Sequence, residues 1–197
     1  MSKFSLTRQE ENFIEQCLKN ELNNVQKLVK YNVDYTVSNY WAYRIAACKG
    51  YLKLLRYLIN LEPNRKELAD SYILSWTASA NQFDAIQLLI DDGDFYASDN
   101  TAVQWTASNG NIPMMEVLLG YCNDFTNIFG AAAKDGQYKM FEFLLDNGIN
   151  ELDQQFENSF RFAVSFKRKN IADLLVGQGF FSAENVKEET WKKYLGL

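Results

Sequence analysis

One spacing of residues recurs six times along this chain, and it constrains the possible folds more than any other feature. Each copy is centred on a small or turn-forming residue, called here the turn residue, which a pair of aliphatic residues follows eight and nine positions later. Successive turn residues are 26 to 31 positions apart. A period in this range is typical of stacked supersecondary units. The turn residues are Asn20, Gly50, Asn81, Gly110, Gly136 and, in a degenerate copy, Lys167.

Apolar residues flank each turn residue at helical spacing. They stand seven and either four or three positions before it, and mostly two, five, eight and nine positions after it. Offsets of three and four place side chains on one face of a helix, whereas a strand requires alternation. Each stretch is about ten residues long, too short to persist as an isolated helix in water. The pattern therefore predicts helix–turn–helix units that are stable only when stacked, with a left-handed or tight turn that suits Gly and Asn better than Lys167.

Several copies resemble the ankyrin repeat. The stretches Ala46–Leu52, Thr106–Gly110 and Ala132–Gly136 are similar to that family's Ala-Ala-x-x-Gly-x-Leu core, and Phe143–Gly148 is similar to the end of its second helix. The resemblance covers residues 9–180. The copies here are shorter than the family's 33 residues and lack its Thr-Pro-Leu-His opening. We therefore expect shortened fingers, the hairpin loops that join ankyrin repeats, or plain loops. Short, degenerate repeats of this kind resemble those of viral and intracellular-pathogen ankyrin proteins.

The expected fold is all-α, an α-solenoid of about six ankyrin-like helix-turn-helix repeats in one domain, residues 1–197. A C-terminal capping helix within residues 181–197 would begin near Ser182 and close the stack. The residues expected to cover the last repeat are Val186, Trp191, Tyr194 and Leu195. The expected repeats are residues 9–38, 39–69, 70–98, 99–124, 125–155 and 156–180.

Length and composition predict a globular intracellular protein. With 197 residues, 47% of them hydrophobic, the chain can bury a core as one domain. No apolar run approaches the roughly 20 residues of a membrane span, and residues 1–8 contain no apolar run typical of a signal peptide. Cys17, Cys48 and Cys122 are an odd number far apart in sequence, which favours a reducing, cytoplasmic compartment. We expect no membrane partner, and a monomer when the chain is alone.

The residues of common catalytic and metal sites are missing. The chain has no histidine, which excludes Ser-His-Asp and Cys-His catalysis and His-ligated zinc. The cysteine spacing offers no metal site, and no dinucleotide or P-loop motif occurs. We therefore predict no catalytic residue, cofactor or metal. An enzyme using Asp91 and Asp92 is the less favoured alternative, because adjacent residues on a helix point about 100° apart.

Charge is distributed unevenly along the chain. The net charge is −5, yet from Glu67 to Ala133 there are nine acidic residues and no Lys or Arg. An acidic surface can dock a basic partner and steer its approach. One hypothesis is that this stretch binds, and so inhibits, a protein that handles nucleic acid; direct nucleic-acid binding is disfavoured. The other interpretation is a solvated surface without a role. The members of the stretch at the end of the third expected repeat and in the finger that leads to the fourth are Asp91, Asp92, Asp94 and Asp99, with Phe95 and Tyr96 among them.

The resemblance to ankyrin repeats implies that a partner protein is bound by the fingers and by the first helix of each repeat near its turn. Carried over position by position, it selects the two residues before each turn residue. It also selects the residue just before the four positions that correspond to the family's Thr-Pro-Leu-His motif. A neutral contact centred on Ser79, Ser108 and Asn109 is the rival to the acidic surface, and it fits a scaffold or adaptor with no inhibitory role. The residues selected by the resemblance are Tyr40, Cys48, Lys49, Ser71, Ser79, Ala80, Asn100, Ser108, Asn109, Thr126, Lys134 and Asp135.

Aromatic residues recur at one position of the repeat. Trp76 and Trp105 both stand five positions before their turn residue, where Ile45 and Phe162 stand in other copies. This offset predicts core packing rather than a platform for stacking nucleic-acid bases.

The repeat register makes a direct prediction for Leu118, which stands eight positions after Gly110. Its side chain should be fully buried between two hairpins. The variant Leu118→Ala should therefore lower the free energy of unfolding by about 2–5 kcal/mol in chemical denaturation. A loss below about 1 kcal/mol would mean that the register is wrong.

Overall fold

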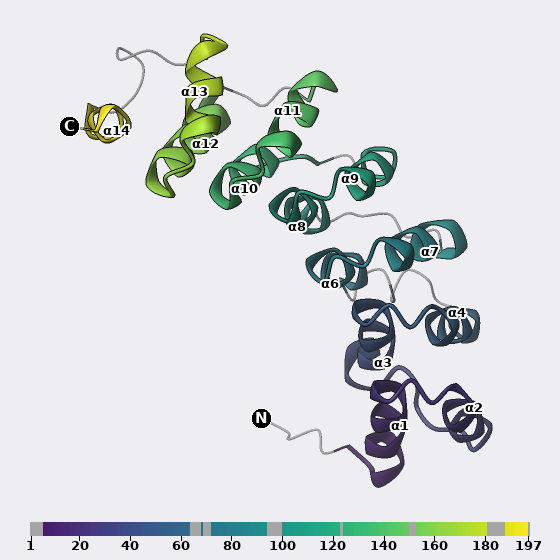
Figure 1. Cartoon of the computed structure of the whole chain (residues 1–197). Helices are drawn as coiled ribbons and strands as arrows, with labels where there is room; N and C mark the ends of the chain where they lie inside the picture. Colours follow the sequence, from purple (N-terminus) through teal and green to yellow (C-terminus); the bar gives the residue numbers. More distant parts are fainter. Residues whose placement is uncertain are drawn as a thin grey trace. The chain divides into compact units, whose positions relative to one another are not determined.

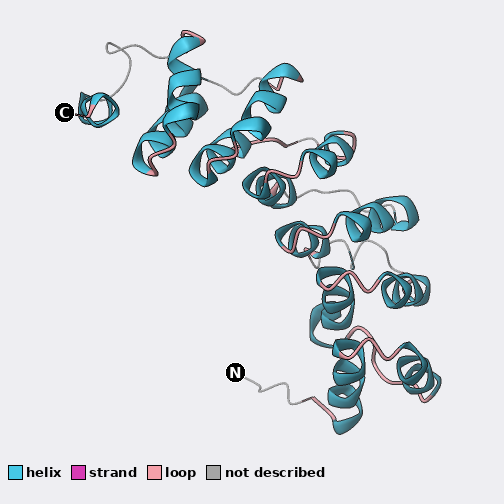
Figure 2. Cartoon of the chain, in the orientation of Figure 1, coloured by secondary structure: helices cyan, strands magenta, loops and turns pink. Residues whose placement is uncertain are grey.

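The computed structural model of the chain describes residues 6–63, 68, 72–93, 100–122, 124–149, 153–180 and 188–196. The described elements are helices, with no β-strand among them (Figure 2), which confirms the all-α prediction. They fall into two compact units, unit 1 (Met1–Ala97) and unit 2 (Ser98–Leu197). The single domain expected from the sequence stays a prediction. Five residues of the predicted binding set lie outside the described residues: Ser71, Asp94, Phe95, Tyr96 and Asp99.

Unit 1 is built from helical hairpins whose helices form two layers (Figure 1). The first helices lie in one layer, with α3 packed between α1 and α6, and in the second layer α4 packs on α7. The described residues between α2 and α3 form a plain connection without a strand, as expected for a shortened finger. The hairpins are α1 (Arg8–Leu18) with α2 (Leu22–Lys30), α3 (Val37–Cys48) with α4 (Leu52–Leu61), and α6 (Ile73–Ser79) with α7 (Phe83–Gly93).

Unit 2 repeats this arrangement and adds a terminal helix. Helix α10 packs between α8 and α12, while α11 packs on α13 and α14 packs on α12. The hairpins are α8 (Thr101–Asn109) with α9 (Ile112–Leu119), α10 (Ile128–Asp135) with α11 (Tyr138–Asp146), and α12 (Asp153–Ser165) with α13 (Lys169–Gly177), followed by α14 (Glu188–Leu195).

All six predicted turn residues adopt the left-handed backbone conformation. Their φ angles lie between 55° and 78°, and Gly and Asn are the residues that tolerate this region best. Lys167 adopts it as well, with φ 60°. For a residue with a Cβ atom, this conformation is less stable than the right-handed one by about 1–2 kcal/mol. The degenerate sixth copy therefore keeps the geometry of the other five, and the helix–turn–helix prediction is confirmed at each copy.

The core is a stripe along each first helix and a second stripe along its partner. First helices α3, α6, α8, α10 and α12 bury the residues three, four, seven and eight positions before the turn residue; in α8 these are Ala102, Val103, Thr106 and Ala107. Helix α1 buries only the residues three and seven positions before its turn. The buried Thr106 hydroxyl donates to the carbonyl of Ala102 at 2.9 Å, so that its polarity is satisfied within the helix. In α9, Leu118 is fully buried, as predicted. Its neighbour Glu116 is exposed, so Glu116→Ala is a matched control for Leu118→Ala.

The prediction that Trp76 and Trp105 pack in the core is wrong. Each side chain is 46% exposed. The physical reason is angular: at about 100° per residue, the position five before the turn lies roughly 130° around the helix from the middle of the buried stripe. Trp76 and Trp105 therefore stand on the face that the stacked hairpins leave open, whereas Ile45 at the equivalent position of α3 is 6% exposed.

A side chain from each following repeat closes the preceding turn in several copies. Gln137, the residue after turn residue Gly136, donates from Nε2 to the carbonyl of Ser108 at 2.7 Å. In the next repeat Arg168 donates from Nε to the carbonyl of Lys134 at 3.2 Å. These carbonyls belong to the last turn of α8 and α10, where helices leave carbonyl groups without intrahelical partners. The contact thus links neighbouring hairpins and satisfies a helix end at the same time.

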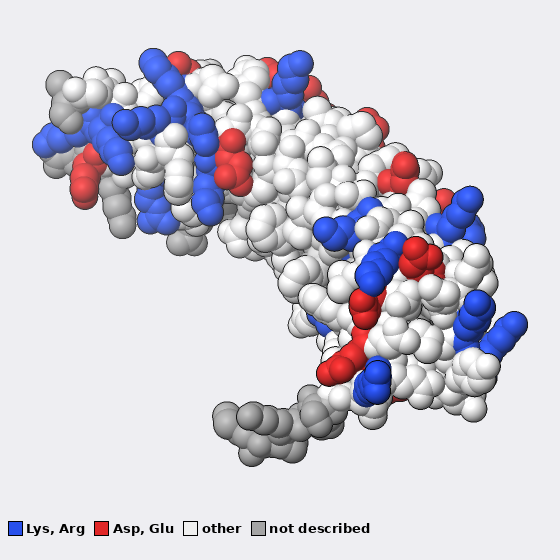
Figure 3. Space-filling model, turned by 60° about the horizontal axis from the view of Figure 1, so that its bottom comes forward, with Lys and Arg blue, Asp and Glu red and all other residues white. Residues whose placement is uncertain are grey.

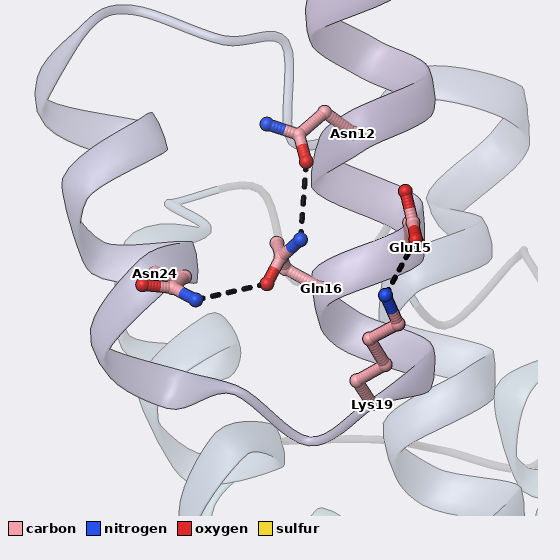
Figure 4. Close-up of polar contacts among 5 residues, drawn as sticks. All are labelled: Asn12, Glu15, Gln16, Lys19 and Asn24. Carbon is pink, nitrogen blue, oxygen red and sulfur yellow. Dashed lines mark hydrogen bonds and ion pairs between the residues drawn. The ribbon is translucent and has the colours of Figure 1, made fainter.

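The first hairpin carries a polar network on α1 and α2 (Figure 4). Gln16 donates to Asn12 Oδ1 at 3.1 Å and accepts from Asn24 Nδ2 at 3.0 Å, so one side chain joins the two helices. Lys19 and Glu15 form an ion pair one helical turn apart on α1. These side chains lie on the exposed surface of the first hairpin.

At the other end α14 lies against α12. Phe160 of α12 contacts the rings of Trp191 and Tyr194, with centroids 6.1 and 5.4 Å away. Asp173 of α13 accepts hydrogen bonds from Lys169 and Tyr194, and these lower the pKa of the Asp173 carboxyl. Trp191 and Tyr194 therefore cover the last repeat as expected, whereas Leu195 is largely exposed. The predicted helix start at Ser182, and Val186, lie outside the described residues.

The closing contact of Gln137 predicts a difference between two glycines of the same backbone conformation. Gly110 has φ 69°, and a Cβ there would collide with the side-chain amide of Gln137. Gly148 has φ 68°, but a Cβ there would meet no atom within 4 Å. We expect Gly148→Ala to lower the free energy of unfolding by about 1–2 kcal/mol through its backbone conformation alone. Gly110→Ala should lower it by more, as measured in urea unfolding.

The double variant Gly110→Ala with Gln137→Ala tests the cause of the difference. Removing the amide should recover part of the extra cost, because residues in direct contact do not act additively. Equal losses for Gly110→Ala and Gly148→Ala would show that Gln137 does not constrain the turn.

Candidate functional site

The exposed sides of three successive first helices surround a hollow in unit 2. Its volume is about 550 Å³, and we call it the unit 2 groove. Because α10 packs between α8 and α12, these helices present the same positions of the repeat side by side. The lining residues are Thr101, Gln104, Trp105 and Ser108 from α8, Asn127, Gly130, Ala131, Lys134 and Asp135 from α10 and the residue before it, and Asn158, Arg161 and Phe162 from α12.

Two large aromatic side chains flank a floor of small residues. Trp105 of α8 and Phe162 of α12 stand five positions before their turn residues, and Ala131 holds this position in α10 between them. Gly130 is buried beside Ala131, and a Cβ on it would approach the ring of Phe162 to 3.4 Å. Small residues on the middle helix therefore leave the space that the two rings border.

Two cations lie at the groove without an acidic partner among the described residues. The Lys134 ammonium lies 5.9 Å from the ring centroid of Phe166. The Arg161 guanidinium lies 6.0 Å from the centroid of Phe162, and it donates to Asn158 Oδ1 at 2.8 Å. Asp135 is the single carboxylate among the lining residues. Figure 3 shows that Lys and Arg side chains gather at the C-terminal end of unit 2.

The connection that precedes α10 is held against α8 by hydrogen bonds. Gln104 donates to the carbonyl of Thr126 at 3.1 Å, and Asn100 donates to Asp124 Oδ2 at 3.2 Å. Asp124 also accepts from Thr126, whose hydrogen bonds lower the pKa of the Asp124 carboxyl, as does Asn100. The same Asp-aromatic-Thr sequence at Asp34–Thr36 makes the same turn in unit 1. These contacts fix the rim of the groove beside Thr101.

The unit 2 members of the predicted binding set gather at or beside this groove. Ser108, Lys134 and Asp135 line it. Asn109 is half-buried at the end of α8, and the exposed Thr126 and half-buried Asn100 belong to the adjoining connection. Sequence reasoning missed the rest of the lining. The signal was present, because the positions two, five, six and nine before the turn lie opposite the buried stripe of each first helix.

The unit 1 members of the set are more dispersed. Tyr40 is 6% exposed and its ring packs edge-on against Tyr43, so we leave it out of the proposed binding surface. It ends three successive residues with left-handed backbone at the start of α3, which turns it inward. Burial raises the pKa of the Cys48 thiol, and the charges of Arg44 and Lys49 partly oppose this rise. Lys49 is exposed, while Ser79 and Ala80 are half-buried at the end of α6.

Unit 1 also presents aromatic side chains on its first helices. The Arg44 guanidinium lies 5.1 Å from the ring centroid of Trp41 and 5.7 Å from that of Trp76. Burial lowers the pKa of Arg44, and its Nη2 donates to the carbonyl of Ser38 at 2.9 Å. Trp41 and Trp76 are 38% and 46% exposed. Exposed tryptophans therefore occur on the first-helix face of each unit.

The acidic stretch is described in part. Four of its nine acidic side chains lie among the described residues, and all four are exposed: Asp84, Asp91, Glu116 and Asp124. The first two belong to α7 of unit 1 and the other two to unit 2. Asp92 lies in α7, but its side chain is outside the described residues.

The described residues contain no group of three or more His, Cys, Asp or Glu side chains that could hold a metal ion. Within the same part of the chain, no helix has the length and apolar character needed to cross a membrane.

Comparison with known proteins agrees with the repeat architecture. A family model described as ankyrin repeats in three copies matches residues 43–128 and, overlapping them, residues 74–155. Together the two matches span more than half of the chain. No curated protein matches it. With six in-register helix–turn–helix copies, left-handed turns at each and this family match, the chain belongs to the ankyrin-repeat family.

Proposed function

We propose that this protein is a non-catalytic module that binds a partner protein on the exposed face of its first helices, with the unit 2 groove at the centre of the site in that unit. Ankyrin repeats are protein–protein interaction modules and are typically non-catalytic. The observation that carries the proposal is a hollow of about 550 Å³ lined by three successive first helices and bordered by Trp105 and Phe162.

The exposed tryptophans support this choice of face. Folding does not require a tryptophan five positions before the turn, since Ala131 serves at the same position in α10. Tryptophan is among the residues that contribute most to binding at protein interfaces, because its large ring becomes desolvated there. Trp76 in unit 1 and Trp105 in unit 2 stand at this position on exposed faces. A role in partner binding explains why these large apolar side chains are exposed to solvent instead of packed in the core.

A bulky residue at Ser108 should test the proposal. Ser108 lines the groove at the end of α8, so Ser108→Tyr should fill it and lower the amount of partner captured from host-cell lysate by about tenfold or more. Lys139→Tyr adds the same side chain at an exposed position of α11 and should leave capture unchanged. Far-ultraviolet circular dichroism should be the same for both variants. Full capture by a folded Ser108→Tyr protein would remove the groove from the site.

A second candidate role follows from the acidic stretch. All four of its described acidic side chains are exposed, the stretch itself contains no Lys or Arg, and exposed acidic groups favour docking of a basic surface. In this role the protein would bind the basic, nucleic-acid-handling face of another protein and inhibit it. A neutral scaffold or adaptor is the alternative. The enzyme alternative has less support, since Asp91 is exposed at the end of α7.

Neutralising four of these acids should distinguish the roles. If the stretch docks a basic partner, replacing Asp91, Asp92, Asp94 and Asp99 by Asn should weaken binding and flatten its dependence on salt, because fewer charge pairs form. The measurement is the dissociation constant of the captured partner at low and high NaCl. An affinity that does not change at either salt concentration would retire the basic-partner role and leave the first-helix face as the site.

A further inference from the structure

We propose that the unit 2 groove recognises a short acidic segment of the partner protein, in which a bulky apolar side chain sits between Trp105 and Phe162 and a neighbouring carboxylate pairs with Lys134 or Arg161. This inference rests on the proposed function and specifies the chemistry of the partner at that face.

The apolar part of the proposal follows from the shape of the groove. Trp105 and Phe162 stand at its two sides on α8 and α12, while Gly130 and Ala131 of α10 form the floor. A bulky apolar side chain placed there would contact ring surface on both sides and small residues beneath. Aromatic walls provide large contact area at low cost in side-chain entropy. The space is thus suited to one anchoring side chain of a peptide segment.

The acidic part follows from the charges around that space. The lining holds Lys134 and Arg161 against the single carboxylate of Asp135. Neither cation has an ion-pair partner among the described residues; Lys134 lies over Phe166 and Arg161 over Phe162. Arg168 adds positive charge nearby, since it donates to the carbonyl of Lys134. A partner carboxylate would find charge-assisted donors here, and displacement of water by the apolar anchor would strengthen the pairing.

Nucleic acid is the other polymer that cations and exposed rings could bind, and the groove fits it less well. Binding a nucleic-acid backbone depends on several phosphate contacts, whereas the lining offers two cations and one carboxylate. An acidic peptide segment needs one or two charge pairs and one apolar seat, which the lining residues supply.

The test uses the full chain and fluorescein-labelled synthetic peptides in anisotropy titrations. The probe is a pool of short peptides rich in Asp and Glu with one central Trp, Phe or Leu. One control pool replaces the central residue by Ala, and another replaces the acids by Lys. We expect binding of the probe pool, a loss of about tenfold or more for either control, and weaker binding as NaCl rises. Equal binding of the Lys pool, or no binding of the acidic pool, would overturn the inference.

Protein variants localise the effect. The double variant Lys134→Glu with Arg161→Glu should lower probe affinity by about tenfold or more, and Ala131→Trp should do so by filling the seat. Lys53→Glu with Lys139→Glu makes the same change in net charge at exposed positions on α4 and α11 and should bind as the unaltered chain does. Unchanged affinity in the groove variants, or stronger binding of a single-stranded oligonucleotide at this site, would contradict the inference.

Lysate capture separates this inference from the proposed function. If Ser108→Tyr loses the natural partner while Lys134→Glu with Arg161→Glu retains it at full affinity, protein binding at the groove stands and the acidic-segment inference falls. If the folded Ser108→Tyr protein and the folded Lys134→Glu with Arg161→Glu protein both retain the partner at full affinity, the groove is not the binding site. The proposed site and the acidic-segment inference are then both wrong. Loss of the partner from both supports the acidic segment.

Discussion

The stability of each described helix depends on burial against its neighbours in the stack. Helices of 7 to 13 residues cannot hold themselves together in water, so each survives because its apolar stripe is covered by neighbours. Small residues such as Ala102, Thr106 and Ala107 on α8 let first helices approach closely. The left-handed turn then sets the second helix against the first. Side chains such as Gln137 add a polar link from one repeat to the turn of the repeat before it.

The same constraint determines where binding can occur. In α3, α6, α8, α10 and α12 packing uses the positions three, four, seven and eight before the turn, and it therefore leaves most of the opposite face of these helices open to solvent. Residues on that face are free to vary without harm to the core, which is why Trp105, Ala131 and Phe162 can occupy one repeat position in successive helices. Where a small residue stands between two large ones, a hollow results. Its cations, Lys134 and Arg161, come from that face as well.

The sequence predicted the repeat, its turns and its buried residues because these depend on local periodicity. Asn20, Gly136 and even Lys167 adopt the left-handed conformation that the spacing required, and Leu118 is buried as its register demanded. The prediction for Trp76 and Trp105 failed because hydrophobicity was given more weight than angular position on the helix. Tyr40 was placed at the surface by its offset from the turn, yet three left-handed residues turn it into the core beside Tyr43.

By itself the sequence determined the architecture, since a period of about 30 residues with helical offsets has few stable solutions, and it excluded histidine-dependent catalysis by these 197 residues, since none of them is a histidine. The repeat pattern places Trp105, Gly130 and Arg161 on the exposed faces of their helices, but tertiary structure decided that they line one hollow. The lining comes from three helices whose residues span positions 101 to 162. That proximity arises from stacking, which brings equivalent positions of successive repeats side by side.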